Sequence, residues 1–241
     1  MNNNLLSIAM TTYNGENFLR QQMDSIILQT YPHFEVIICD DQSTDSTYKI
    51  LQEYAARDAR IKPFINDINL GVIKNFEKAL SLCSGKYIAL ADQDDIWMPD
   101  KIAIILSYLE NADIVIHDCQ IIDENSTLLF NSFFEQNRAK SGLMNNLLKN
   151  SYVGCSMAFN RKIIDKALPF PSDIPMHDWW IGLIGEIYGN TVFCTEKLIA
   201  YRRHENNASA STGISQYSLL KKIHFRIIML RNLLKRYFLH V

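Results

Sequence analysis

The chain has 241 residues, which is enough for one domain with a sizeable core. Hydrophobic residues make up 48% and charged residues 21%, and this balance excludes a wholly disordered or fibrous chain. The net charge of −2 combines 16 Lys/Arg and 25 Asp/Glu in residues 1–200 with eight Lys/Arg and one acid after them, and so acidic a main body argues against nucleic acid as a partner.

Targeting and membrane-spanning signals are the next feature to consider. The apolar stretch 5–10 is short and follows no basic region, so no secretory signal is expected. No run of eighteen apolar residues occurs, so no transmembrane helix is expected either. The five cysteines are widely spaced and form no CxxC pair, which favours buried, reduced thiols over disulfides. These features together predict a cytoplasmic protein.

Short β-branched runs alternate with helical periodicity along the first 117 residues. Strands are predicted at 5–12, 34–39, 61–65, 87–91 and 112–117, and helices at 16–29, 44–57, 71–83 and 99–110. This order predicts an α/β fold with a mostly parallel central sheet flanked by helices. Ligands of such sheets bind at the carboxyl ends of the strands, where the polar segments 11–14, 40–41 and 92–95 fall.

Beyond residue 118 the pattern loosens. Residues 125–150 are expected to be a variable insertion, and strands are predicted at 151–159, 191–194 and 197–201. The small, polar residues 206–215 predict a flexible linker. We therefore predict one domain at 1–205, made of halves at 1–118 and 119–205, followed by a linker and a helix at 206–241.

An acidic cluster at Asp92, Asp94 and Asp95 follows the fourth predicted strand. Three carboxylates within four residues repel one another unless a cation compensates them. Side chains at i and i+2 of an extended backbone share one side, so Asp92 and Asp94 can bind one ion. Oxygen ligands favour Mg²⁺ or Mn²⁺, bound together with substrate phosphates. The alternative is a solvated acidic turn before the next helix, and this chemistry alone does not separate sugar transfer from nucleotidyl transfer or phosphate hydrolysis.

Six segments, in this order and spacing, resemble the family 2 glycosyltransferases, which have the GT-A fold. They are Met-Thr-Thr-Tyr-Asn at 10–14, Ser-Ile-Ile-Leu-Gln-Thr-Tyr at 25–31, Cys-Asp-Asp-Gln-Ser-Thr-Asp at 39–45, Asn-Leu-Gly at 69–71, Ser-Gly-Lys-Tyr-Ile at 84–88 and Asp-Gln-Asp-Asp-Ile-Trp at 92–97. The resemblance covers about half of the chain, roughly residues 5–118. It implies that 1–205 is the catalytic domain, with a nucleotide-binding half at 1–118 and an acceptor-side half at 119–205. The last segment is similar to that of bacterial rhamnosyltransferase-type members.

The resemblance implies an enzyme that transfers a sugar from a UDP- or dTDP-linked donor to a hydroxyl of a glycan or lipid-linked acceptor, in the synthesis of bacterial surface polysaccharide such as O-antigen or capsule. It implies that Thr11 and Tyr13 hold the nucleotide base and that Asp41 accepts the N–H of that base. The alternative for Tyr13 is an aromatic packed in the core. The alternative for Asp41 is a turn residue or a helix cap.

The resemblance also assigns the metal side of the site. It places Asp92 near the ribose and the metal, makes Asp94 the principal metal ligand, and lets Asp95 orient Asp94 or contact the donor sugar. Lys74 falls where the family often has a basic residue near the donor.

Direct displacement at a sugar carbon requires a base that takes the proton of the acceptor hydroxyl. We choose Asp178, which follows a proline-rich loop and precedes Trp179 and Trp180, two rings suited to packing against sugar faces. One displacement would invert the anomeric configuration. The family has an acid before this position, whereas this chain has His177. The alternative is that Asp178 caps a helix and both tryptophans lie in the core.

Residues 201–207 resemble a segment near the end of many family catalytic domains. The resemblance implies that His204 is a third metal ligand and that Arg202 contacts the diphosphate. The alternative is that both belong to an ordinary loop end.

The basic end of the chain has helical periodicity. Ile223, Ile227, Leu230, Leu234 and Phe238 occupy one arc of a helix, and the basic residues fall outside that arc. Such a helix suits the anionic inner surface of the cell membrane. The alternative is a terminal helix docked on its own domain or on a partner.

Two other functions compete with glycosyl transfer. A sugar nucleotidyltransferase would be expected to have a glycine-rich phosphate loop near the first strand, and residues 12–16 contain a single glycine. The second is a non-catalytic protein that binds nucleotide-sugar or scaffolds a complex. The intact Asp92 and Asp94 pair argues against it, but Asp178 alone does not exclude it.

Overall fold

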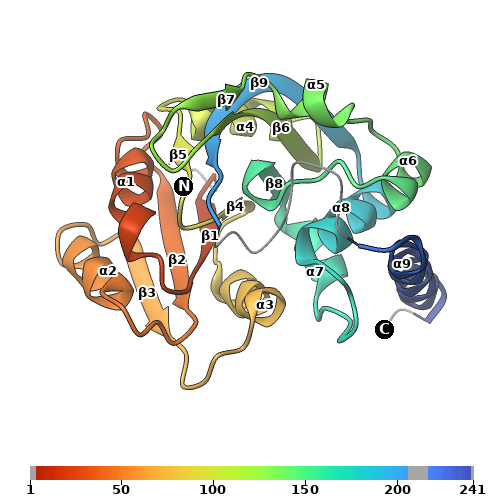
Figure 1. Ribbon diagram of the computed structural model, residues 1–241, viewed down its shortest axis with the longest axis horizontal. Helices are drawn as coiled ribbons and strands as arrows, with labels where there is room; N and C mark the ends of the chain where they lie inside the picture. The colour runs from red at the N-terminus through yellow and green to blue at the C-terminus, as the bar shows by residue number, and fades with distance from the viewer. Residues whose placement is uncertain (1–3, 206–216, 240–241) are drawn as a thin grey trace.

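The computed structural model describes residues 4–205 and 217–239, and the predicted linker therefore lies outside the described residues (Figure 1). The strands are β1 (Leu6–Thr12), β2 (Phe34–Asp40), β3 (Ile61–Ile65), β4 (Tyr87–Ala91), β5 (Ile96–Trp97), β6 (Ile114–Ile122), β7 (Leu128–Phe130), β8 (Met157–Asn160) and β9 (Thr191–Arg202). The helices are α1 (Glu16–Ile27), α2 (Thr47–Ala55), α3 (Val72–Leu82), α4 (Lys101–Leu109), α5 (Phe133–Asn137), α6 (Leu143–Leu148), α7 (Arg161–Ala167), α8 (His177–Tyr188) and α9 (Leu219–Leu239), with a 3₁₀ turn, η1 (Gly154–Ser156).

One curled sheet contains all of these strands in the order β3-β2-β1-β4-β8-β6-β9-β5, and β7 pairs with β6 outside that order. Strands β3, β2, β1 and β4 are parallel, and β6 is parallel to β9. The antiparallel strands are β8, which lies between β4 and β6, together with β5 and β7. The predicted α/β fold with a mostly parallel sheet flanked by helices is confirmed.

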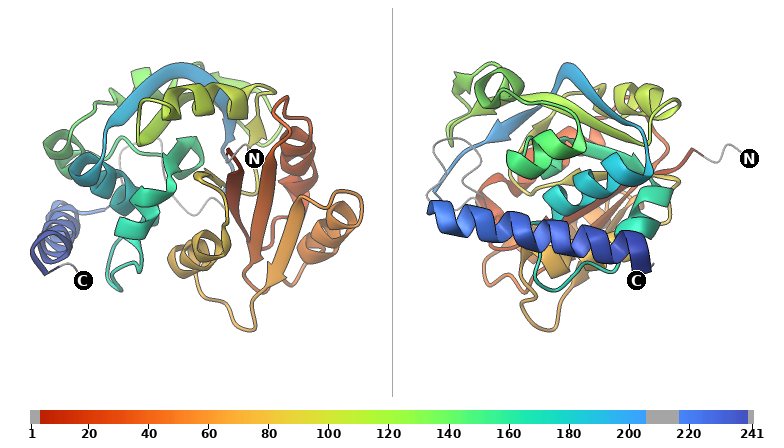
Figure 2. Two further views of the ribbon diagram at one scale, coloured as in Figure 1. Left: turned by 180° about the vertical axis from the view of Figure 1, so that it is seen from behind. Right: turned by 90° about the vertical axis from the view of Figure 1, so that its right-hand side faces the viewer.

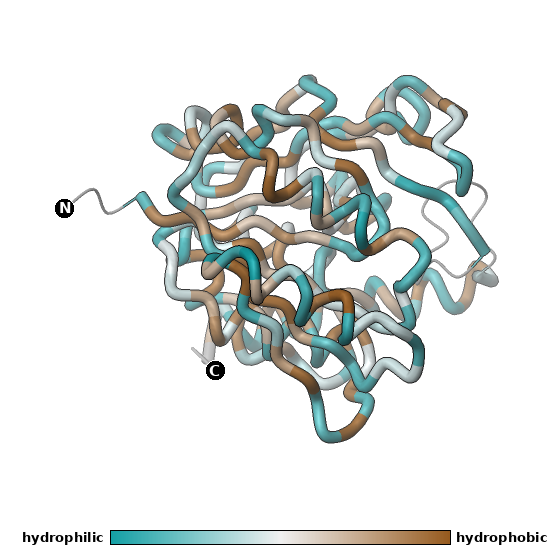
Figure 3. The backbone as a smooth tube through the Cα atoms, turned by 90° about the vertical axis from the view of Figure 1, so that its left-hand side faces the viewer, coloured by the Kyte–Doolittle hydropathy of each residue, from teal (hydrophilic) through white to brown (hydrophobic). Residues whose placement is uncertain are grey.

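Alternating side chains on the central strands fill two separate cores. Leu6, Ile8 and Met10 of β1 face the core that α1, α2 and α4 cover. Ala9 of the same strand faces the core that α3, α7 and α8 cover. Because each face is apolar, both must be covered by helices, as Figure 2 shows from two sides. Brown, apolar stretches recur along strands and helices in Figure 3.

The second half of the chain differs from the prediction in three places. The expected insertion contains β7, α5 and α6, elements too short to show a clear period. The strand predicted at 151–159 is mostly a loop and η1, and only its last three residues belong to β8. The two strands predicted between 191 and 201 are one strand, β9, whose polar middle corresponds to shifts in its register with β6. Strand β6 also crosses residue 118, where we divided the two halves, and that division stays a prediction.

Helix α9 docks on the domain with a face that the sequence pattern did not indicate. Met229 and Leu233 are buried in the second core beside α8, whereas the predicted apolar arc is exposed. No helix among the described residues is both long and apolar enough to cross a membrane. All five cysteines are buried and free, as the sequence predicts.

Candidate active site

The carboxyl ends of β1, β2 and β4 meet at one edge of the sheet because these strands are adjacent and parallel. Thr12, at the end of β1, donates its hydroxyl to Asp40 Oδ2 at 2.7 Å. The Gln93 side chain, just past β4, accepts from the Tyr13 N–H at 2.8 Å and donates to the Tyr13 carbonyl at 3.1 Å. These bonds join the three segments that the sequence analysis singled out.

A cavity of about 390 Å³ lies at this edge, and it is lined by Tyr13, Asn14, Gly15, Asn17, Phe18, Gln93 and His204. Tyr13 is 50% exposed, so it is not the core aromatic of the alternative interpretation. An exposed ring beside a cavity offers a face on which a flat heterocycle can stack. Thr11 is half-buried one position inside the end of β1.

Asp41 organises the loop that leads into α3. Its carboxylate accepts the N–H groups of Leu70 at 2.7 Å and Gly71 at 2.9 Å, and the Asn66 amide at 2.8 Å. Gly71 has φ +76°, a left-handed conformation that favours glycine, which explains its place in the sequence segment. Asp41 therefore holds a loop in place, and the cavity next to Tyr13 is lined by other residues. Its contact with a base stays a prediction.

His204 and Asp94 form a pair although 110 residues separate them. The Asp94 Oδ2 atom lies 2.8 Å from His204 Nε2, and Asp94 is 7% exposed. The imidazole also packs against Phe18, with ring centroids 4.8 Å apart. A carboxylate oxygen and an imidazole nitrogen at the rim of an open cavity suit a divalent cation such as Mn²⁺.

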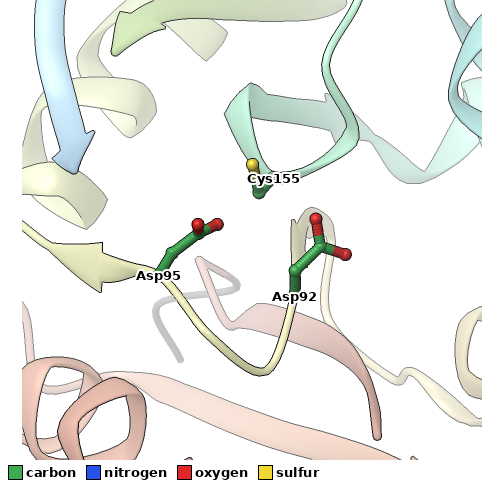
Figure 4. A group of neighbouring side chains, drawn as sticks. All are labelled: Asp92, Asp95 and Cys155. Carbon is green, nitrogen blue, oxygen red and sulfur yellow. The ribbon is translucent and has the colours of Figure 1, made fainter. Parts of the chain in front are cut away.

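Asp92 and Asp95 form a second acidic group with the thiol of Cys155, and Figure 4 shows the three side chains close together. One ligand atom of each lies within 4.8 Å of the others. Burial, reinforced by the charge of Asp94, raises the pKa of Asp95 to about 7. Burial and the charges of Asp95, Asp94 and Asp178 hold the pKa of Asp92 well above its usual range.

This grouping differs from the predicted one, in which Asp92 and Asp94 bind one ion from the same side of an extended backbone. The strand ends at Ala91 and the chain bends at Gln93 and Asp94, so the i and i+2 rule for strands no longer applies. Asp95 Oδ2 is buried and has no hydrogen-bond partner among the described residues, an acceptor that a nearby cation would satisfy. The residues present therefore fit a divalent ion. Asp94 and His204 would be its ligands on the side of the cavity.

A buried lysine lies beneath the acidic group. Lys101 is fully buried, and its ammonium donates to the Cys155 carbonyl at 2.8 Å and lies 3.7 Å from the centre of the Trp97 ring. Burial lowers its pKa to about 7, and the charges of Asp95 and Asp92 oppose that shift. Lys101 thus links the η1 turn to the carboxylates electrostatically.

Replacing Lys101 with methionine should destabilise the fold by about 3 kcal/mol, because removal of one member of a buried charge group leaves the others uncompensated. Urea unfolding measures this loss. The matched control is Lys162→Met, which removes an exposed ion pair with Asp113 at 2.7 Å and should change stability by less than about 1 kcal/mol. Equal losses in the two variants would contradict the compensating role of Lys101.

Asp178 lies in the first turn of α8, beside η1. Its Oδ1 accepts the Trp179 N–H at 2.6 Å, and an N–H of Gly154 also bonds to the carboxylate. Burial nevertheless raises its pKa to about 6. Its charge acts on Asp92, so the fold brings residue 178 to the acidic group.

The two tryptophans after Asp178 do not face the site, and that prediction is wrong. Trp179 is 8% exposed and Trp180 is fully buried. Their indole N–H groups donate to the carbonyls of Asn146 and Ala167, both at 2.9 Å. A helix that is apolar around most of its circumference is buried. Trp179 and Trp180 of α8 therefore belong to the second hydrophobic core.

His177 replaces the acid expected before Asp178. Its ring stacks on Phe76 with centroids 4.0 Å apart, and neither ring nitrogen has a partner among the described residues. Burial lowers its pKa to about 3, so the ring is neutral. His177 therefore fills an apolar space where a carboxylate would carry charge.

Arg202 and Lys74 lie apart from the cavity. Arg202 is 1% exposed, and its guanidinium donates to the Asp94 carbonyl, to Gln21 and to the loop at 123–126. Its backbone N–H donates to Asp95 Oδ1 at 3.0 Å. Direct contact with a diphosphate, as predicted, would require this network to open. Lys74 is exposed and pairs with Glu77, one turn along α3.

Comparison with solved structures confirms the fold class. Crystallised S. aureus TarS 1-349 in complex with UDP-GlcNAc has a TM-score of 0.73 at 17% identity, over 95% of this chain and 67% of that chain. The mannosyltransferase PcManGT from Pyrobaculum calidifontis, in complex with GDP-Man and Mn²⁺, has a TM-score of 0.62 at 19% identity, over 84% and 58%. The fold and its strand-end site define an α/β protein of the GT-A type.

Sequence relatives identify the family. An uncharacterized glycosyltransferase of Haemophilus influenzae is 32% identical over 241 residues, covering 91% of this chain and 72% of that protein. The UDP-Glc:alpha-D-GlcNAc-diphosphoundecaprenol beta-1,3-glucosyltransferase WfgD of Escherichia coli is 29% identical, with coverage of 88% and 82%. The putative teichuronic acid biosynthesis glycosyltransferase TuaG of Bacillus subtilis is 28% identical, with coverage of 92% and 86%. Residues 7–168 match the family model of Glycosyl transferase family 2. The chain therefore belongs to this family.

Proposed function

We propose that the chain is an inverting, metal-dependent glycosyltransferase that moves a sugar from a UDP- or dTDP-linked donor to a hydroxyl of a glycan or lipid-linked acceptor. The observation that carries the proposal is the meeting of Asp94, His204, Asp92 and Asp178 around one turn, beside the cavity at Tyr13. The named relatives in E. coli and B. subtilis support a role in bacterial surface polysaccharide synthesis. In this proposal the enzyme acts on the cytoplasmic side of the membrane.

In this proposal Tyr13 stacks on the nucleotide base, and Thr11 and the loop held by Asp41 complete the base-binding edge. Asp94 and His204 would hold Mn²⁺ or Mg²⁺, with Asp92 and Asp95 contributing negative charge nearby. When bound, such an ion supplies Lewis-acid stabilisation to the departing nucleoside diphosphate.

The base of the proposed reaction is Asp178. Its carboxylate takes the proton from the acceptor hydroxyl as that oxygen attacks the anomeric carbon, so the bond to the diphosphate breaks on the opposite face and the configuration inverts. The backbone N–H groups of Trp179 and Gly154 orient the carboxylate, whose remaining lone pairs would accept from the acceptor hydroxyl. The raised pKa makes Asp178 a stronger base than an ordinary aspartate.

The two competing functions differ in what the site would do. A sugar nucleotidyltransferase would belong to a different class from the family matched by residues 7–168. A non-catalytic scaffold would bind a donor without turnover. A transfer assay with a donor that is shown to bind separates such a scaffold from an enzyme. The rhamnosyl donor implied by the segment at 92–97 is one candidate among the donors to be screened.

A nucleoside diphosphate with Mn²⁺ should raise the melting temperature. At a ligand concentration of 100 times Kd the stabilisation is about 2.7 kcal/mol, which corresponds to roughly 5–10 °C for a chain of this size. Differential scanning fluorimetry with UDP, dTDP and GDP, each with and without Mn²⁺, measures this shift and identifies the base. Equal shifts with and without the ion would contradict the role of Asp94 and His204.

A further inference from the structure

Helix α9 has two apolar faces, and only one of them is used by the fold. The inner face packs through Met229 and Leu233, and polar contacts flank it: Arg226 donates to the Leu148 carbonyl at 3.0 Å, and Asn232 donates to Asp173 Oδ1 at 2.8 Å. Arg236 donates to the Leu168 carbonyl at 2.9 Å. The orientation of the helix on the domain is therefore determined by contacts along most of its length. The right-hand view of Figure 2 shows the helix lying across the domain.

The outer face is a row of exposed apolar side chains, which we call the outer stripe. Its members are Leu220 (80% exposed), Ile223 (45%), Ile227 (58%), Leu230 (46%), Leu234 (48%), Tyr237 (54%) and Phe238 (70%). At about 100° per residue they span an arc of roughly 100°, on the side of the helix away from Met229. A continuous row of this length is more than the scattered exposed apolar residues of an ordinary surface.

Charge borders the outer stripe on one flank. Lys221, His224, Arg231 and Lys235 are exposed and lie in a row beside it, and the sequence of α9 contains no Asp or Glu. Arg231 pairs with Asp173 in the turn before α8, so Lys221 and Lys235 supply most of the positive charge of this row. On the other flank α6 abuts the helix through the Arg226 contact, and its Met144 and Leu148 are 64% and 61% exposed. The whole face is apolar and positively charged.

We propose that this face binds an anionic lipid surface, with the outer stripe inserted at the level of the headgroups and the basic row against their charges. A basic helix with a strong apolar face lies in the plane of such an interface. The three- and four-residue spacing of the stripe would also suit a coiled coil with a second copy. In such a coiled coil the basic residues of two α9 helices would lie beside each other with no acidic residue of either helix to pair with them. This repulsion between like charges would destabilise the coiled coil.

Flotation of the full-length protein with vesicles tests the proposal without any need for transfer activity. The protein should float with vesicles of phosphatidylglycerol and phosphatidylcholine, should bind vesicles of phosphatidylcholine alone much more weakly, and should lose affinity as salt rises. Replacing Ile227 and Leu234 with glutamine should weaken binding by at least about 100-fold, because two large apolar groups no longer leave water. Replacing Lys221 and Lys235 with glutamine should weaken it roughly 30-fold, because each charge near the surface contributes about fivefold.

The matched control is Leu128→Gln with Phe130→Gln, which removes similarly exposed apolar groups (52% and 45%) from β7 and should leave vesicle binding unchanged. Because all of these side chains are exposed, each variant should fold as the wild type does. Thermal melting verifies this. The proposal is overturned if the wild type binds neither vesicle, or if it binds both equally at all salt concentrations. It is also overturned if light scattering shows that the wild type is a dimer and the Ile227/Leu234 variant a monomer, while neither protein binds vesicles.

Discussion

Asp178→Asn should lower kcat by about 10²- to 10⁴-fold, the range that a positioned general base contributes. The asparagine oxygen can still accept the Trp179 N–H, which bonds to Asp178 at 2.6 Å, so α8 should begin as before. What is lost is the acceptance of a proton from the acceptor hydroxyl. Single-turnover and steady-state transfer assays measure the change in rate.

The stabilisation by nucleoside diphosphate and Mn²⁺ should be the same in Asp178→Asn as in the wild type, because donor binding precedes proton transfer. Asp165→Asn, on the exposed side of the neighbouring helix α7, is a control of equal chemistry and should keep full activity. A wild-type kcat in Asp178→Asn would exclude this residue as the base and direct attention to Asp92.

The pH dependence of the wild type follows from the same residue. Burial raises the pKa of Asp178 to about 6, so the carboxylate gains its proton at a higher pH than an ordinary aspartate. Only the ionised form can act as base. The kcat should therefore fall about tenfold per pH unit below this pKa and be constant above it. A cation bound nearby would lower the pKa of Asp178 and so shift this acidic limb of the pH profile to lower pH. Asp178→Asn should lack the limb.

Asp94→Asn should reduce transfer by at least about 1000-fold, because stabilisation of the leaving diphosphate by a metal is worth several kcal/mol and each 1.4 kcal/mol is a factor of ten. The amide can keep a hydrogen bond to His204, which now lies 2.8 Å from Asp94 Oδ2, so the loop should stay in place. The melting shift produced by UDP or dTDP with Mn²⁺ should disappear in the variant.

Asp100→Asn is the control for Asp94→Asn. Asp100 is exposed, accepts the Thr30 hydroxyl at 2.8 Å, and should be dispensable for turnover. His204→Ala should retain more activity than Asp94→Asn but require a higher Mn²⁺ concentration for half-maximal rate. Unchanged turnover of Asp94→Asn at every Mn²⁺ concentration would remove Asp94 from the mechanism.

The strand ends of the site were predictable because they depend on local patterns. Apolar runs that end in Thr12, Asp40 and Ala91 set the strands, and parallel strands place their carboxyl ends together. The direction of each carboxylate was not predictable. The chain bends at Gln93 and Asp94, and it is Asp95, not Asp94, that lies with Asp92 and Cys155; no spacing rule predicts that bend. Lys101 and Cys155 were missed because a single lysine at a helix start and a single cysteine carry no recognisable motif.

The second half of the chain was less predictable because its elements are short and stabilised by distant contacts. One signal was present and unused: Ser132 and Glu135 have the spacing of a helix cap. Ser132 Oγ accepts the Glu135 N–H at 3.0 Å at the start of α5. The orientation of α9 could not be read from periodicity, since both Met229 and Ile227 belong to apolar rows and only the surface of α8 decides which row is buried.

The pairing of Asp94 with His204 has a consequence for biosynthesis of the protein itself. The residues of the nucleotide edge emerge early from the ribosome, whereas His204 and the strand that carries it emerge near the end. A nascent chain stopped before β9 would have β1, β2 and β4 but would lack His204. It would also lack the hydrogen bonds from Arg202 to Asp94 and Asp95. Contacts of such high sequence separation form late. The metal site that we propose at Asp94 and His204 would therefore be complete only when translation of the domain is almost finished.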